Sequence, residues 1–203
     1  GLGPLAVAAA LAACVWGYDA RLKRVRILGP VVMGACRGLS LLLGAVCCAP
    51  DAVGDPRILA PAGALTAYIA AVTFIAANET RATPLRGLRW APAATMLLLI
   101  VALQLPACGA LLSLPAFGQD ELAVVTIALL ILAAGSTFSA AERLSGCPAP
   151  VTVQRTIGHL IRTLLLVHAA VAGLMAFPYW LIAVALLAAW PVSAMLARRF
   201  CAS

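Results

Sequence analysis

The chain has 203 residues, of which 64% are hydrophobic and 10% are charged, and its formal net charge is +7. Its mean hydropathy of +1.06 excludes an ordinary soluble domain, because too little polar surface remains to cover a globule. Apolar runs of about 20 residues, the length that crosses a bilayer, recur along the chain. The runs are continuous rather than alternating, which favours helices. We therefore predict an all-α, polytopic membrane helical bundle that forms one integral membrane domain over residues 1–203.

Seven apolar segments follow one another, separated by short loops that contain charged residues, proline or glycine. The chain begins at a glycine inside the first segment, which predicts an N-terminal truncation. A signal peptide is the alternative, but no basic region precedes the apolar run. The seven predicted transmembrane helices are approximately Leu2–Gly17, Leu28–Ala49, Pro61–Ala77, Ala91–Leu114, Leu122–Ala141, Thr156–Phe177 and Leu181–Ala197.

Twelve of the fourteen Lys and Arg residues fall on one side of these spans, whereas Arg57 falls on the other side and Arg37 lies inside a span. Basic loops face the cytoplasm in membrane proteins, so we predict Gly1 outside and Ser203 in the cytoplasm. Because the basic residues are clustered in this way, we interpret the net charge as a determinant of topology and of contact with anionic lipid headgroups. We do not expect it to bind nucleic acid. The twelve are Arg21, Lys23, Arg24, Arg26, Arg81, Arg86, Arg89, Arg143, Arg155, Arg162, Arg198 and Arg199.

Several familiar kinds of site are excluded by the residues present. The seven cysteines form no CxxC pair and lie mostly in apolar runs, where a free cysteine acts as a small hydrophobe, so neither a zinc site nor a disulfide framework is implied. The chain contains no nucleotide-binding glycine loop, no GxSxG and no HExxH. A retinal protein is excluded because Lys23, the only lysine, lies in a predicted loop.

The stretch from Tyr18 to Gly44 combines a basic cluster with one charge inside an apolar run. Arg37 is ten residues past Ile27 and therefore about 15 Å along the predicted helix, near the middle of the membrane. An arginine at that depth costs at least ~2.5 kcal/mol unless it faces water or a partner. Arg37 is therefore a candidate functional residue, and an arginine that snorkels or pairs structurally is the alternative.

Small residues accompany Arg37 along the same predicted helix. Ser40 and Gly44 follow it by three and seven positions, so they share its face and leave room for a cavity or for a closely packed helix. Gly34 and Gly38 form a GxxxG pattern on a neighbouring face, which indicates packing against another helix.

Two charged loops on the predicted cytoplasmic side are candidate binding regions. The cluster after the first span either sets the topology or recognises an anionic headgroup such as a diphosphate, which needs several convergent cations. At the end of the third span, Glu79 either pairs with Arg81 or, with Asn78 beside it, shares a magnesium ion with substrate phosphate. The cluster after the first span consists of Asp19, Arg21, Lys23, Arg24 and Arg26.

Other polar residues are predicted to be structural. Arg155, His159 and Arg162 fall on one helical stripe, which predicts an interfacial, amphipathic start to the sixth span. Gln104 and His168 are predicted to form helix–helix hydrogen bonds rather than to bind a ligand.

The run Tyr18-Asp19, then Lys23-Arg24 and Gly29-Pro30, then MGACRGLSLLLGA resembles the middle of the UbiA superfamily of intramembrane prenyltransferases. It is most similar to the divergent EboC-like bacterial branch of that superfamily. The run that begins at Tyr68 and ends at Asn78-Glu79 resembles the next helix of the family. The resemblance covers most of the chain and is most specific over residues 18–44 and 66–81.

The resemblance implies a helical bundle around a central cavity, in a bacterial cell membrane. It implies an enzyme that transfers a prenyl group from a prenyl diphosphate to a lipophilic or aromatic acceptor, with Mg²⁺ as cofactor. Residue by residue, it implies diphosphate binding by Lys23, Arg24, Arg37 and Arg81, catalytic roles for Arg37 and Tyr18, and metal binding by Glu79 and Asn78.

The chain departs from the family pattern in its acidic residues. The first family motif, NDxxD on an early helix, is absent from the chain, and the second, DxxxD, is replaced by Asn78 and Glu79. A non-catalytic membrane carrier or scaffold for an isoprenoid or similar lipid is therefore the alternative function. An unrelated small-molecule transporter, which would show inverted repeats or broken helices, is a third possibility.

Overall fold

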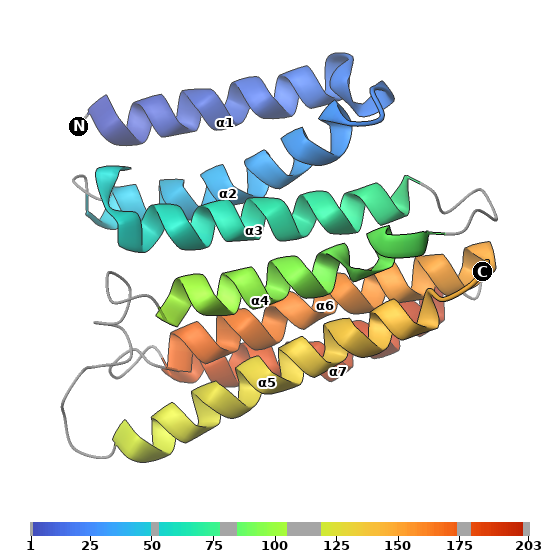
Figure 1. The fold of residues 1–203 in the computed structure, drawn as a ribbon. Coiled ribbons are helices and arrows are strands. Elements are labelled where there is room, and N and C mark those ends of the chain that lie inside the picture. The colour runs from blue at the N-terminus through green and yellow to red at the C-terminus, as the bar shows by residue number, and fades with distance from the viewer. Residues whose placement is uncertain (1, 50–52, 78–84, 105–118, 174–179, 201–203) are drawn as a thin grey trace.

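The computed structural model describes residues 2–49, 53–77, 85–104, 119–173 and 180–200, and this part of the chain is helical without any strand (Figure 1). This confirms the predicted all-α class. Two 3₁₀ turns, η1 (Leu22–Arg24) and η3 (Arg86–Trp90), accompany the α-helices. The α-helices are α1 (Leu2–Ala20), α2 (Leu28–Cys48), α3 (Pro56–Ala76), α4 (Ala91–Gln104), α5 (Gln119–Arg143), α6 (Pro150–Gly173) and α7 (Trp180–Phe200).

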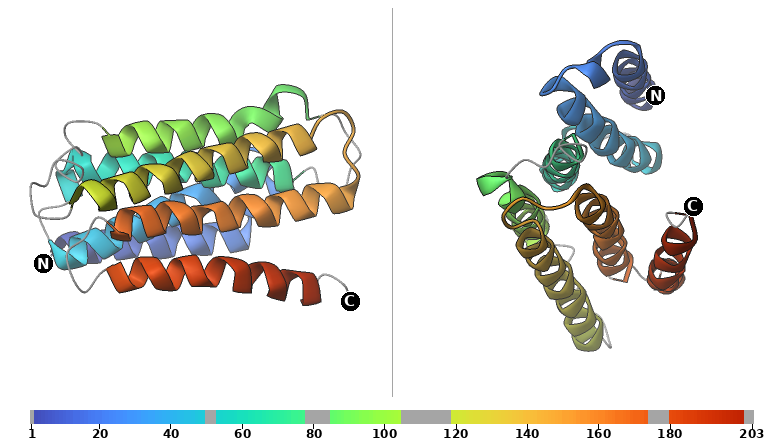
Figure 2. Two further views of the ribbon diagram at one scale, coloured as in Figure 1. Left: turned by 90° about the horizontal axis from the view of Figure 1, so that it is seen from below. Right: turned by 90° about the vertical axis from the view of Figure 1, so that its right-hand side faces the viewer.

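Successive helices run in opposite directions, so the described chain starts at one end of the bundle and finishes at the other (Figure 1). Helix α3 lies at the centre, where it contacts α2, α4 and α6, and the end-on view of Figure 2 shows α1 beyond α2. The burial agrees with this placement, because 50% of the apolar stretch of α3 is buried against 6% of that of α1. The core of the bundle therefore lies around α3.

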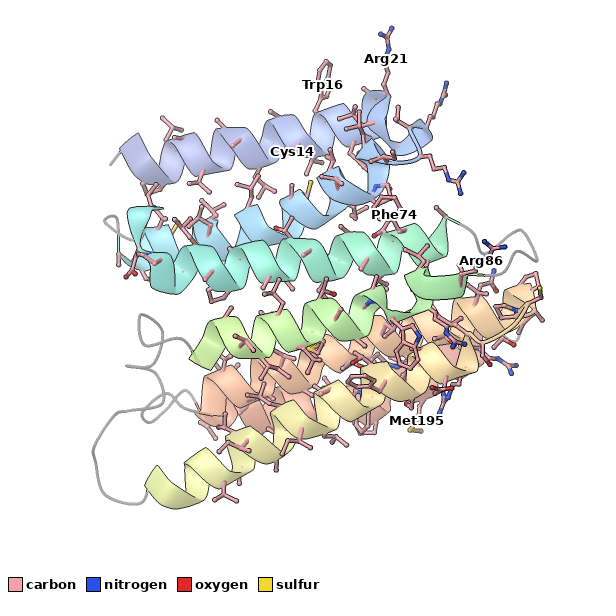
Figure 3. The ribbon with its side chains drawn as sticks, viewed as in Figure 1. Cys14, Trp16, Arg21, Phe74, Arg86 and Met195 are labelled. Carbon is pink, nitrogen blue, oxygen red and sulfur yellow. The ribbon has the colours of Figure 1, made fainter. Side chains whose placement is uncertain are left out.

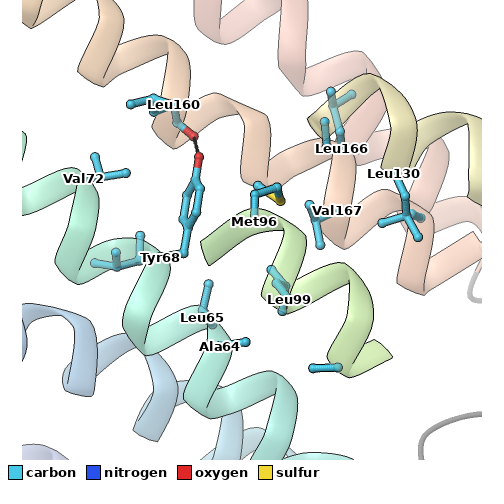
Figure 4. Packing of buried hydrophobic residues seen from close by; sticks show 14 of the residues in the cluster. Ala64, Leu65, Tyr68, Val72, Met96, Leu99, Leu130, Leu160, Leu166 and Val167 are labelled. Carbon is cyan, nitrogen blue, oxygen red and sulfur yellow. Dashed lines mark hydrogen bonds between the residues drawn. The ribbon is translucent and has the colours of Figure 1, made fainter. Parts of the chain in front are cut away.

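Tyr68 of α3 anchors this core, since it is fully buried and its hydroxyl donates a hydrogen bond of 2.8 Å to the carbonyl oxygen of Leu160 in α6. Figure 4 shows the Tyr68 ring spanning the space between the two helices, with Met96 and Leu99 of α4 beside it. A buried hydroxyl without a partner would be costly. The bond to Leu160 removes that cost and ties α3 to α6.

Helices α2 and α3 approach each other closely at two glycines. A Cβ atom on Gly34 would meet the carbonyl oxygen of Thr66, and one on Gly38 would lie 2.7 Å from the carbonyl oxygen of Ala62. Only a residue without a side chain fits at either position, as in other GxxxG contacts. The predicted packing role of this pattern is confirmed, with Ala62 and Thr66 of α3 as the opposing surface.

Four of the described helices contain stretches long and apolar enough to cross a membrane, and a fifth, Leu181–Leu196 in α7, is apolar but shorter. These helices are compatible with a membrane protein. The prediction that all seven helices cross the bilayer stays a prediction. The four stretches are Gly3–Ala20, Leu28–Cys48, Ile58–Ala76 and Val124–Arg143.

Several predicted helix ends were wrong by a turn or more. The third and sixth segments were predicted to begin at Pro61 and Thr156, but α3 begins at Pro56 and α6 at Pro150. The predicted boundaries place these prolines in loops as helix breakers, whereas proline also fits the first turn of a helix, because its missing N–H has no helical partner there. The Pro61 ring then lies within α3, close to its start.

The first helix also extends further than predicted. It ends at Ala20 rather than at Gly17, so Tyr18 and Asp19 belong to the last turn of α1 and not to a loop. The fifth helix likewise begins at Gln119 instead of Leu122. In both cases polar residues continue a helix beyond its apolar run, where hydropathy no longer marks it.

Candidate anion-binding site

Most of the described basic residues gather at one end of the bundle, which we call the basic end. It is formed by the connection between α1 and α2, by η3, and by the connection between α5 and α6 (Figure 1). Figure 3 shows Arg21 and Arg86 at this end, on different sides of α3. The residues of the predicted basic side that the structure describes at this end include Arg21, Lys23, Arg24, Arg26, Arg86, Arg89 and Arg143. Arg81 lies outside the described residues, and the assignment of that side to the cytoplasm stays a prediction.

The first group of cations at the basic end, which we call the η1 cluster, consists of Arg21, Lys23, Arg24 and Arg26, all of them exposed. Lys23 Nζ lies 3.9 Å from Asp19 Oδ1, one helical turn earlier, in an ion pair whose side chains are 48% and 68% exposed. Such a pair contributes little to stability. The η1 cluster is therefore a solvated surface that attracts anions without enclosing them.

The η1 turn itself is held in place by two glycines. A Cβ atom on Gly29, at the start of α2, would lie 3.2 Å from the carbonyl oxygen of Leu22 and 3.4 Å from the Lys23 backbone. On the other side, a Cβ on Gly17 would lie 3.3 Å from the Leu22 side chain. The backbone that carries the cluster is thus packed between α1 and α2, although its charged side chains extend outward.

Arg37, the predicted catalytic residue, is exposed and lies in the middle of α2. It comes nine residues after Leu28, where α2 begins, which corresponds to about 14 Å along the axis. Lys23 and Arg24 therefore lie at a different depth from Arg37. Tyr18, the other predicted catalytic residue, is half-buried in the last turn of α1.

The face of α2 beside Arg37 is exposed. Ser40 and Gly44 are both exposed, and a Cβ atom on Gly44 would meet nothing within 4 Å. The face of α2 with Arg37 is thus distinct from the face on which Gly34 and Gly38 pack against α3. Long basic side chains extend along such a face toward the membrane surface, so the Arg37 guanidinium has room to reach toward the basic end.

The predicted metal-binding pair Asn78 and Glu79, together with Arg81, lies outside the described residues, so these predictions remain open. Within the described ranges, no group of three His, Cys, Asp or Glu residues is placed to hold a metal ion. Carboxylates described near the η1 cluster include Asp19, which pairs with Lys23.

A cavity that the sequence did not reveal lies at the basic end, on a different side of α3 from the η1 cluster (Figure 3). Its volume is about 400 Å³, within the range of roughly 300–1,000 Å³ typical of small-molecule sites. One wall comes from η3 and the other from the segment that follows α5. The lining residues are Arg86, Gly87, Arg89, Trp90, Leu144 and Gly146.

Aromatic rings fix one of the two guanidinium groups in this cavity. The Arg89 Cζ atom lies 5.2 Å from the centre of the Trp90 ring, in a cation–π contact. Trp90 in turn packs against Phe138 of α5, with ring centres 5.9 Å apart and a tilt of 57°, which is a favourable aromatic geometry. Arg89 is therefore better ordered than the cations of the η1 cluster.

The backbone at the cavity is strained. Arg86 has a φ of 42°, and a left-handed conformation costs a non-glycine residue about 1–2 kcal/mol. Across the cavity, Gly146 has a φ of 68°, which glycine adopts without that cost. Strain that persists in a fold often marks a functional position, and here it places an arginine where glycine would be easier.

A polar network between α5 and α6 involves one of the predicted interfacial residues. Ser136 Oγ lies 2.7 Å from His159 Nε2 and 3.0 Å from Thr163 Oγ1, and the Thr163 hydroxyl donates to the His159 carbonyl. Every partner is satisfied if His159 donates to Ser136 and Ser136 donates to Thr163. His159 thus joins two helices instead of facing a ligand, while Arg155 is exposed as predicted.

The predicted helix–helix hydrogen bond of His168 is not formed. His168 is exposed, and its Nδ1 atom lies 2.6 Å from the Leu164 carbonyl one turn earlier in α6, so its bond stays within one helix. The predicted bond of Gln104, at the end of α4, lies outside the part of the chain whose side chains are described.

Comparison with known proteins adds no further assignment: no family model, no curated protein and no solved structure matches the chain.

Proposed function

We propose that the protein is an intramembrane prenyltransferase of the UbiA type, which transfers a prenyl group from a prenyl diphosphate to a lipophilic or aromatic acceptor. The observation that carries the proposal is the arrangement of cations in the connection between α1 and α2 and on α2. The η1 cluster lies at the basic end, and Arg37 lies on an exposed, small-residue face about halfway along α2. In the proposal, these cations would bind the diphosphate, and the apolar surface beside them would accommodate the prenyl chain.

In this proposal all seven helices cross a bacterial cell membrane, with the N-terminal end outside and the basic end in the cytoplasm. Basic loops favour the cytoplasmic side, and the described basic residues are gathered accordingly. Prenyl diphosphate then enters from the cytoplasmic leaflet, with its diphosphate at the basic end and its chain among the helices.

Lys23 and Arg24 would bind the diphosphate, because charge-assisted hydrogen bonds to phosphate oxygens are about twice as strong as neutral ones. Arg37 and Arg81 would stabilise the negative charge that develops as the allylic C–O bond breaks. The electron pair of that bond leaves with the diphosphate, the acceptor carbon then bonds to the allylic cation, and a proton is lost from the acceptor. Tyr18, at the end of α1, would orient the diphosphate by hydrogen bonding.

A magnesium ion would be held by Glu79 and Asn78, and it would supply further neutralisation of the departing diphosphate. The remaining roles belong to the residues of the chain. Because the ion and the cations act on the same leaving group, removal of either should slow bond cleavage more than binding.

The test is transfer of a labelled prenyl group by the purified protein in lipid nanodiscs. Prenyl diphosphates of several chain lengths are supplied with Mg²⁺ and a bacterial lipid extract, and the label in the organic phase is measured. We expect Arg37→Ala and Glu79→Gln to lower turnover by about tenfold or more, since each removes an interaction with developing charge. The control Arg155→Ala, an exposed cation on α6, should leave turnover unchanged.

The non-catalytic carrier predicts a different pattern in the same experiment. It would bind the labelled prenyl diphosphate without releasing diphosphate at any chain length. Turnover that is unchanged in both Arg37→Ala and Glu79→Gln would overturn the assignment of these residues. Binding without turnover would overturn the enzyme and support the carrier.

A further inference from the structure

We propose that the cavity between η3 and the α5–α6 connection binds the phosphate group of an anionic membrane lipid. This site shares no residue with the diphosphate site proposed above, and it lies on a different side of α3 from the η1 cluster (Figure 3). It does not depend on the proposed prenyl transfer. Three features of the described residues support it: the charge of the walls, the rigidity of the floor, and the apolar surface that leads away from it.

The charge of the walls selects an anion. Arg86 and Arg89 both line the cavity, and Arg143 adds a third cation in the last turn of α5. Arginine presents several N–H donors in a planar fork that matches phosphate oxygens. The contact of Arg89 with Trp90 orders its guanidinium before a ligand arrives, which lowers the entropy that binding must overcome.

The floor of the cavity is rigid. Leu144, a lining residue, is 1% exposed and packs with Ile75, Leu85 and Val153 in a small buried cluster. Leu85 immediately precedes η3, and Val153 lies in the first turn of α6, so this cluster fixes the two walls relative to each other. The cavity therefore keeps its shape without a ligand.

An apolar stripe leads from the cavity along α5. Phe138, which contacts Trp90, is 41% exposed, and Ile131, seven residues earlier on the same stripe, is 66% exposed. Between them a Cβ atom on Gly135 would meet nothing within 4 Å. A lipid with its phosphate between Arg86 and Arg89 would thus find an apolar surface of about 10 Å for its chain. Trp90 lies at the junction, as tryptophan does at membrane interfaces.

The chemistry of a phosphate group is shared by lipid headgroups and by free phosphates, and the experiment separates these sources. The purified protein in detergent is examined by native mass spectrometry with phosphatidic acid, with phosphatidylcholine, and with inorganic phosphate or diphosphate as competitors. We expect one equivalent of phosphatidic acid to bind at least about tenfold more tightly than phosphatidylcholine, because its exposed phosphate monoester accepts from both arginines.

Two variants test the site directly. Arg86→Gly removes one guanidinium and also relieves the left-handed strain at that position, so the variant should melt no lower than the wild type while its affinity for phosphatidic acid falls about tenfold. Arg89→Gln should cause a loss of the same size. The matched control Arg155→Gln removes an exposed cation of α6 that does not line the cavity, and it should bind phosphatidic acid like the wild type.

Two results would overturn the proposal. Equal retention of phosphatidic acid by the wild type, Arg86→Gly and Arg89→Gln would show that the cavity is not the binding site. Competition by inorganic phosphate or diphosphate that equals competition by phosphatidic acid would show that the ligand is a free phosphate, and would exclude the lipid. Loss of prenyl transfer in Arg37→Ala has no bearing on either result, so the two proposals fail separately.

Discussion

The η1 cluster and the η3 cavity lie at the same end of one bundle, yet they present their charge in different ways. The cluster contains more cations, but its side chains are exposed and Lys23 is paired loosely with Asp19 at 3.9 Å. The cavity has fewer cations, but Arg89 is held against Trp90 and Leu144 forms a buried floor. A dense cluster attracts anions from a distance, whereas donors held in place before a ligand arrives discriminate between anions.

Different helices and buried residues hold the two regions in place. The η1 cluster depends on α1 and α2, which join the core through the close contact of α2 with α3. The cavity depends on the small buried cluster around Leu144. Changes in one support should therefore leave the other region intact, and the following predictions test that separation in order of decreasing effect.

Gly38→Leu should have the largest effect, a loss of about 3 kcal/mol or more in the free energy of unfolding. Its side chain would collide with the Thr66 side chain and with the Ala62 carbonyl, and such overpacking against backbone cannot relax easily. Thermal unfolding in detergent measures the loss. Gly44→Leu on the same helix is the matched control and should be nearly neutral, because its site is open. Equal destabilisation by both would contradict the α2–α3 contact.

Leu144→Ala should reduce the free energy of unfolding by about 2–3 kcal/mol, the usual loss for a buried leucine that leaves a cavity. It should also weaken binding of phosphatidic acid in the η3 cavity, because the floor would no longer fix the two walls. Leu98→Ala in α4, where the side chain is 54% exposed, is the control for both measurements. If the two variants unfold at the same denaturant concentration, the floor is not rigid.

Tyr68→Phe should cost about 1 kcal/mol, since it removes one buried hydrogen bond, to the Leu160 carbonyl, while the ring still fills its place. This bond joins α3, which packs against α2 on the side of the η1 cluster, to α6, which begins near the η3 cavity. Amide hydrogen exchange should increase in both α3 and α6. Faster exchange in only one of them would argue against a link across the core.

Asp19→Asn should have the smallest effect, about 0.5 kcal/mol or less, because the pair with Lys23 is long and exposed. The variant adds one unit of positive charge to the η1 cluster without disturbing its backbone. We expect a slightly tighter association with anionic vesicles that disappears at high salt. A change in melting temperature of several degrees would mean that the pair is structural.

The sequence predicted the helical bundle and α2 with little error, because charged residues precede this apolar run and Pro50 follows it closely. It failed at Pro56 and Pro150, because a proline that starts a helix and a proline that ends one look alike without the backbone. The packing role of Gly34 and Gly38 was predicted from spacing alone, since the GxxxG pattern itself is visible in a short stretch of sequence.

The η3 cavity was not predicted, and the reason is geometric. Its walls come from Arg86–Trp90 and from the segment around Leu144, which are far apart in the chain and meet only after folding. The left-handed backbone at Arg86 could not be predicted either, because arginine rarely adopts this conformation and nothing in the sequence marks it. The run Arg-Gly-Leu-Arg-Trp offered a weak signal, because it combines cations with an interfacial aromatic residue.

The odd number of antiparallel helices in the described chain has a practical consequence for labelling. Leu2 and Phe200 lie at opposite ends of the bundle (Figure 2), separated by about the 30 Å length of a helix of 21 residues. If all seven helices cross the membrane as proposed, a reporter fused before α1 and another fused after α7 would occupy separate compartments of the same cell. One tag would be a protein that fluoresces only in the cytoplasm, and the other an enzyme that is active only in the periplasm. Comparing the two fusions would show which end of the bundle faces the cytoplasm.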